Sequence, residues 1–150
     1  MSRAATPFIV IGSLGVLAGG LLSAISAASP SYLASWAVAY LVLVVGAAQL
    51  VLGLGQDRLA AGEVAPGVIS AELLAFNLAN IAVLAGSLFA VVALTWLGAA
   101  LIIVSMALFI WAVRGSTSEH RGLLWLYRVV VVVLLVSAPI GIVLAHSRMG

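Results

Sequence analysis

Charge is what this sequence lacks most. Of its 150 residues only 7% are Asp, Glu, Lys or Arg, whereas 65% are hydrophobic. A soluble domain carries about 25% charged residues, because charge keeps a surface in contact with water. The composition therefore excludes an ordinary soluble domain. It predicts an integral membrane protein, whose solvent is the lipid bilayer.

Cysteine and lysine are both absent, and there are only two histidines, His120 and His146. Without cysteine there are no disulfides and no thiolate metal sites. Two separated histidines do not supply the paired ligands of a metal or haem within the helices, so we expect no metal and no cofactor. The net charge of +2, without a basic run, indicates no nucleic-acid partner. All basic residues are Arg and the chain is rich in Ala, Val and Gly, as in genomes of high GC content. We therefore expect a bacterial cytoplasmic membrane.

The apolar residues form runs long enough to cross a bilayer, which takes about 20 residues per helix. The block from Val68 to Val113 has one charged residue, Glu72. As a single helix it would be about 69 Å long, so it must fold back, and we place the turn near residues 90–96. Polar stretches at residues 55–67 and 114–122 are predicted loops. The sequence thus predicts an all-α bundle in one domain, with no soluble domain; a four-span arrangement with a re-entrant segment is the alternative. The five predicted transmembrane helices cover residues 7–28, 32–54, 68–90, 94–113 and 123–145.

The distribution of arginine predicts the orientation of these helices. With the N-terminus inside, the inner loops and termini collect Arg3, Arg58, Arg114 and Arg121, and the outer side holds only Arg148. Basic residues gather on the inner side of membrane proteins. We therefore expect the N-terminus inside and, with five spans, the C-terminus outside.

Glycine recurs at steps of three and four in several of the predicted helices, which places it on one helix face. Small residues let helices approach closely in lipid, where the hydrophobic effect does not drive association. Packing within the bundle is the ordinary interpretation of such stripes, although they could also seat a partner subunit. The predicted helix-packing residues are Gly12, Gly15, Gly19, Gly46, Gly53 and Gly141.

The third predicted helix is unusual because it carries Glu72, Asn77 and Asn80 on one broad face. Unpaired carboxyl and amide groups are costly in hydrocarbon, so this face must meet protein or water. From the predicted topology, Arg128 and Gln49 lie at the depth of Glu72, and we expect a buried ion pair or polar cluster. The functional interpretation is a proton or substrate site. The structural one is a pair that locks the bundle, or an Arg128 that extends to the headgroups.

Three classes of function are compatible with these features. The first is a small accessory subunit of a larger membrane complex, such as a respiratory or transport assembly, because the loops are short and no catalytic motif is present. The second is a permease or channel for ions or small solutes, made of several copies that share the polar face of the third helix. The third is a lipid-modifying enzyme using Asp57, Glu63, Glu119 or His120, but nothing in their spacing specifies catalysis. We expect the first, with lipid and other membrane subunits or further copies as partners, and we predict no catalytic residue.

Overall fold

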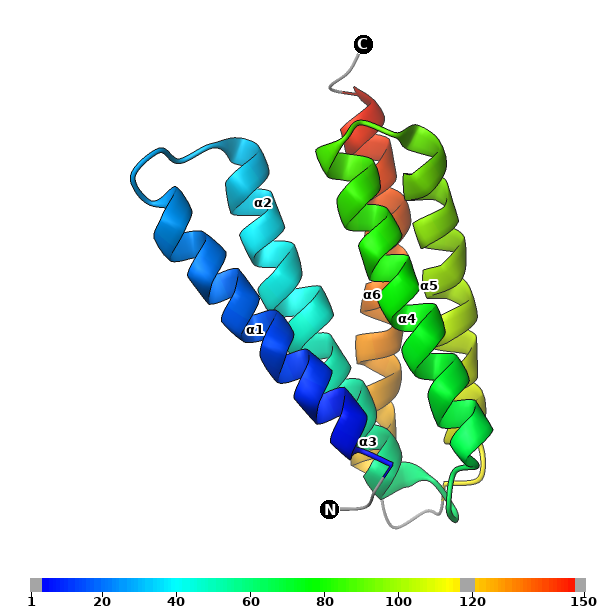
Figure 1. Cartoon of the computed structure of the whole chain (residues 1–150). Coiled ribbons are helices and arrows are strands. Elements are labelled where there is room, and N and C mark those ends of the chain that lie inside the picture. The colour runs from blue at the N-terminus through cyan, green and yellow to red at the C-terminus, as the bar shows by residue number, and fades with distance from the viewer. Residues whose placement is uncertain (1–3, 117–120, 148–150) are drawn as a thin grey trace. The chain divides into compact units, whose positions relative to one another are not determined.

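The protein is built from helices (Figure 1). This computed structural model describes residues 4–116 and 121–147, and their side chains as far as Ser137. Within these residues every regular element is a helix, as the sequence predicts. By its internal contacts the chain divides into two compact units. Unit 1 ends at Arg58 and unit 2 begins at Leu59.

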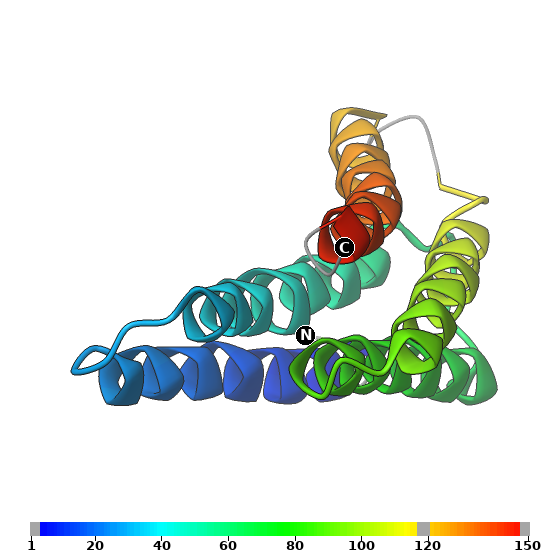
Figure 2. The ribbon, with the colours of Figure 1, turned by 90° about the horizontal axis from the view of Figure 1, so that it is seen from above.

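Unit 1 is a hairpin of two long helices that run side by side (Figure 2). The first is α1 (Thr6–Ser26), with Pro7 in its first turn, where the missing N–H of proline is not needed. The second is one continuous helix, Tyr32–Leu59, whose last residue is counted with unit 2. Its start is fixed by Ser31, whose hydroxyl oxygen accepts a hydrogen bond from the Ala34 N–H at 3.1 Å. A serine at this position satisfies a backbone donor that the first helical turn leaves unpaired.

The second helix of unit 1 changes its winding in the middle. It consists of α2 (Tyr32–Tyr40), the π-helix η1 (Leu41–Ala48) and α3 (Gln49–Leu59). A π-helix is rare and its hydrogen bonds run from i to i+5, which widens each turn. Because of this, the faces of α2 and α3 do not follow one 3.6-residue period. The hydropathy of the sequence predicts a regular helix here and does not indicate this element.

Glycines bring the two helices of unit 1 into backbone contact. A Cβ atom at Gly12 would lie 2.9 Å from the Leu50 Cγ, and one at Gly15 would lie 3.0 Å from the Gly46 nitrogen. Such separations leave no room for a side chain. Gly53 similarly lies against Phe8, and Gly19 against Val42. The predicted packing glycines in unit 1 therefore lie where α1 meets η1 and α3.

Unit 2 contains α4 (Pro66–Leu88), α5 (Val92–Ala112) and α6 (Arg121–Ser147), and α5 packs against both of the others. The chain reverses between α4 and α5 within three residues, close to the predicted turn. There Ala90 has φ 54°, and the Val91 N–H donates to the Gly86 carbonyl oxygen at 2.8 Å. The left-handed conformation costs a non-glycine residue about 1–2 kcal/mol. The tight turn holds α4 and α5 antiparallel.

Four helices are long and apolar enough to cross a membrane, in agreement with the first four predicted spans. The fifth predicted span falls on α6 and stays a prediction, as does the orientation of the termini. Several residues used in these predictions lie outside the described part of the chain: Arg3, Glu119, His120 and Arg148, together with the side-chain surroundings of Gly141 and His146. The four candidate spans are Thr6–Ser26, Tyr32–Leu59, Pro66–Leu88 and Val92–Ala112.

The predicted loop at residues 55–67 is wrong over its first part, because α3 continues to Leu59. Gln, Arg and Leu are good helix formers, so polarity alone does not end a helix. Arg58 lies in the last turn, where a positive charge is stabilised by the negative end of the helix dipole. The loop is therefore confined to residues 60–65, and α4 begins directly after it at Pro66.

Candidate functional site

One face of α4 carries the polar residues that the sequence singles out. Glu72 and Phe76 are completely buried, and Asn80 is 2% exposed. Steps of four residues align these side chains on one side of the helix. The opposite side exposes Leu74, Leu78 and other large apolar residues. Consequently α4 turns its carboxyl group inward and presents hydrocarbon outward.

Asn77 behaves differently from Asn80. It is half-buried, and its Nδ2 donates a hydrogen bond to the Leu73 carbonyl oxygen of its own helix at 2.8 Å. The helical period predicts that Asn77 and Asn80 share one broad face that meets protein or water. The structure instead shows that a bond within α4 satisfies one donor of the Asn77 amide. The Asn77 Nδ2 group therefore does not need an acceptor on a neighbouring helix for this hydrogen bond.

Ser105 of α5 belongs beside this polar face, although it is not among the site residues predicted from the sequence. A Cβ atom at Gly98 would meet Val83, and one at Gly86 would meet Thr95, so these contacts set the register of the antiparallel pair. Along the helix axes, the same register places Ser105 of α5 opposite Phe76 of α4. Ser105 therefore lies at a height between those of Glu72 and Asn80. Ser105 is completely buried. Its hydroxyl group has no hydrogen-bond partner among the described residues.

Tyr127 of α6 completes the group. It is 2% exposed, and its hydroxyl group also has no hydrogen-bond partner in the described part of the chain. Glu72 lies near enough to act on Tyr127 electrostatically. Tyr127 is not among the site residues predicted from the sequence. Tyr127 and Val131 are four residues apart and both are buried, so they lie on one inward face of α6. This spacing is the feature of the sequence that could have placed Tyr127 in the interior.

Arg128 and Gln49 are the predicted partners of Glu72. Arg128 follows Tyr127 in α6 but is exposed, whereas Glu72 is buried. The ion pair between them stays a prediction. Gln49 belongs to unit 1, so its predicted place beside Glu72 stays a prediction as well.

Unit 1 has buried polar groups of its own in α3. Gln49 is completely buried and Gln56 is 4% exposed. Neither polar atom of the Gln49 amide has a hydrogen-bond partner within the described residues. Gln49 is also the first residue after the π-helix η1, where the helical period changes. The change of winding thus adjoins a buried polar side chain.

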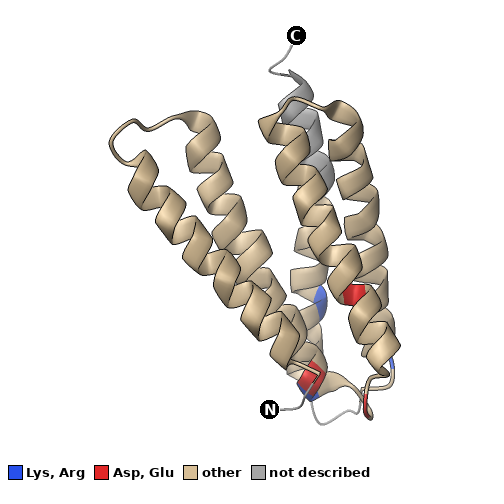
Figure 3. Cartoon of the chain, viewed as in Figure 1, with Lys and Arg blue, Asp and Glu red and all other residues tan. Residues whose placement is uncertain are grey.

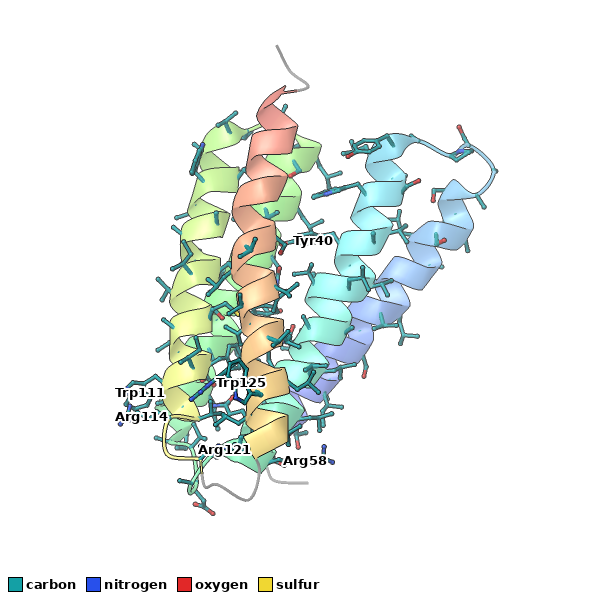
Figure 4. The ribbon with its side chains drawn as sticks, turned by 180° about the vertical axis from the view of Figure 1, so that it is seen from behind. Tyr40, Arg58, Trp111, Arg114, Arg121 and Trp125 are labelled. Atoms are coloured by element: carbon teal, nitrogen blue, oxygen red, sulfur yellow. The ribbon has the colours of Figure 1, made fainter. Side chains whose placement is uncertain are left out.

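The charged residues that the structure describes lie, within each unit, toward one end of the helices (Figure 3). In unit 2, Trp111 and Arg114 lie at the end of α5, and Arg121 and Trp125 at the start of α6 (Figure 4). The guanidinium carbon of Arg114 lies 3.8 Å from the centre of the Trp111 ring, a cation–π contact. Tryptophan and arginine together are typical of the boundary between lipid and water.

The described residues contain no group of three or more His, Cys, Asp or Glu that could hold a metal ion. No protein-family model, curated protein or solved structure matches the chain. The candidate site is therefore defined by the geometry of unit 2 alone. We call Glu72, Ser105 and Tyr127 the polar cluster, with Asn80 at its border.

Proposed function

We propose that the protein is an accessory subunit of a larger membrane protein complex, such as a respiratory or transport assembly. The observation that carries this proposal is a regular seam on the outside of α5. Its six residues follow one another at alternating steps of four and three, and all are exposed. The seam consists of Ala93, Leu97, Ala100, Val104, Ala107 and Trp111.

The seam has the pattern that a second helix recognises. A repeat of seven residues keeps one stripe facing a partner when two helices cross at about 20°. An alanine in every repeat allows the close approach on which helix association in lipid depends. The large residues between them, such as Leu97 at 52% exposed, can fill the spaces of a facing helix. A helix face that contacts only lipid has no need of a seven-residue repeat of small and large side chains.

A permease or channel made of several copies is the alternative, and the arrangement of α4 argues against it. Such a pore would need polar side chains on an outer helix face. In unit 2, Glu72 and Asn80 are buried, whereas Leu74 and Ile81 are both 62% exposed. The outer face of α4 is therefore suited to lipid or to another apolar helix.

The accessory role predicts a stable partner of different sequence. We expect the C-terminally tagged protein, extracted from its own membranes in a mild detergent, to carry that partner in native mass spectrometry. Ala100→Phe should reduce the recovered partner at least tenfold, because the ring blocks close approach at the centre of the seam. Ala18→Phe introduces the same ring at an exposed position of α1 and should leave recovery unchanged. A complex containing only copies of this chain would contradict the accessory role.

Five spans with the N-terminus inside remain part of the proposal, and the natural absence of cysteine makes them testable. Gly62 has open space around it, and Ser29 is exposed. An impermeant maleimide should label Ser29→Cys in intact cells, but Gly62→Cys only in inverted vesicles. A cysteine appended to the C-terminus should label from outside. Labelling of that cysteine from inside would show that α6 does not cross the membrane.

A further inference from the structure

We propose that the polar cluster of unit 2 binds a proton, with the carboxyl group of Glu72 as the acceptor and the hydroxyl groups of Ser105 and Tyr127 as its hydrogen-bonding neighbours. This site is independent of the accessory role. Its basis is that three oxygen-bearing side chains from three helices are buried in a unit whose described helices are otherwise almost entirely apolar.

Two unpaired hydroxyl groups are the main evidence. The hydroxyl groups of Ser105 and Tyr127 have no hydrogen-bond partner among the described residues, and neither side chain is more than 2% exposed. Leaving a buried polar group unpaired costs about 1–3 kcal/mol. These two groups, from different helices, therefore leave hydrogen-bonding capacity open in the part of unit 2 that holds the Glu72 carboxyl group.

The charge of the surroundings suits a proton. Glu72 is the sole ionisable residue of α4, and α5 contains none. From α6 the ionisable neighbour is Tyr127, while Arg128 beside it is exposed. A carboxylate away from water is costly, and binding a proton makes it neutral. The proton adds to one carboxylate oxygen of Glu72, and the new O–H can donate a hydrogen bond to a hydroxyl oxygen.

A metal ion fits this cluster less well. Hard cations take about six or more oxygen ligands. The cluster offers one carboxyl group and two hydroxyl groups, with the Asn80 amide at its border. A proton needs only one acceptor and one neighbouring oxygen. The number of ligands therefore favours the proton over a metal cation.

A hydrophobic carbodiimide tests this directly, because it enters apolar sites and reacts with protonated carboxyl groups. The carboxyl oxygen adds to the central carbon while its proton moves to nitrogen. The acyl group then migrates to the other nitrogen, giving a stable N-acylurea with nothing lost. Peptide mass spectrometry of the full-length protein in detergent should find the label at Glu72, decreasing as the pH rises. A water-soluble carbodiimide should instead label the exposed Glu63.

The hydroxyl groups are tested by their effect on the pH profile. Tyr127→Phe and Ser105→Ala should each move the pH of half-maximal labelling by about half a unit or more. Tyr32→Phe removes the same hydroxyl group from a side chain that is 66% exposed and should leave the profile unchanged. An unchanged profile in both cluster variants would overturn the proposed neighbours.

Two further results would overturn the proposal. Absence of label at Glu72 at every pH would show that its carboxyl group does not take up a proton. Protection of Glu72 by sodium chloride, but not by choline chloride at equal ionic strength, would show that a sodium ion occupies the site instead. Both results come from the wild-type chain, so they do not depend on whether a Glu72 variant folds.

Discussion

Replacement of Gly98 by valine should separate α4 from α5 and destabilise unit 2 by about 3 kcal/mol. A Cβ atom at this position would lie 2.8 Å from the Ala79 carbonyl oxygen and 2.9 Å from the Val83 nitrogen. Both are backbone atoms of α4, so no side-chain rotation relieves the contact. The helices must move apart, and in lipid they lose the close packing that holds them together.

The effect of Gly98→Val can be measured by unfolding the protein in mixed micelles of increasing SDS content, followed by tryptophan fluorescence. Gly20→Val is the matched control, because Gly20 lies inside α1 and has nothing within 4 Å of its Cβ position. Both changes place a β-branched residue in a helix and share its small intrinsic cost. Equal stability of the two variants would show that Gly98 is not a contact that unit 2 requires.

The sequence predicts the spans well because the bilayer imposes a simple rule of length and hydropathy. Four of the expected helices are present as long apolar helices, with their boundaries displaced by a few residues. The largest displacement is at α3, where the polar residues Gln56, Asp57 and Arg58 remain helical. Hydropathy detects where a helix leaves lipid, and this need not be where the helix ends.

The interior of the structure is harder to predict because it depends on contacts between helices. The pattern of α4 predicts that the face with Glu72 meets protein or water, since one helix has one period, and in the structure Glu72 is buried whereas Leu74 is exposed. It does not indicate that Asn77 bonds within its own helix, nor that Tyr127 points inward. Tyrosine also suits the membrane boundary, and a single sequence does not distinguish that location from a buried one. The π-helix η1, which packs against α1, is likewise not predicted by a regular helical period.

The aromatic pair beside the polar cluster supports the last prediction. Phe76 and Phe109 are completely buried, and their rings meet edge to face with centres 6.4 Å apart. Phe76→Ala should destabilise unit 2 by about 2–4 kcal/mol, mostly by leaving a cavity and removing packing contacts. The hydrophobic contribution is small here, because lipid is as apolar as the protein interior.

The same SDS titration measures this loss, and Phe89→Ala provides the control. Phe89 follows α4 directly and is 76% exposed, so its removal should change stability by less than about 0.5 kcal/mol. The double variant of Phe76 and Phe109 should lose less than the sum of the single losses, by about 0.5–1.5 kcal/mol for the ring contact. Strictly additive losses would mean that the rings contribute only by filling space. Losses smaller than additive would show that the two rings stabilise each other directly. Their contact would then help to fix the level at which α4 meets α5, and thereby the position of Ser105 relative to Glu72.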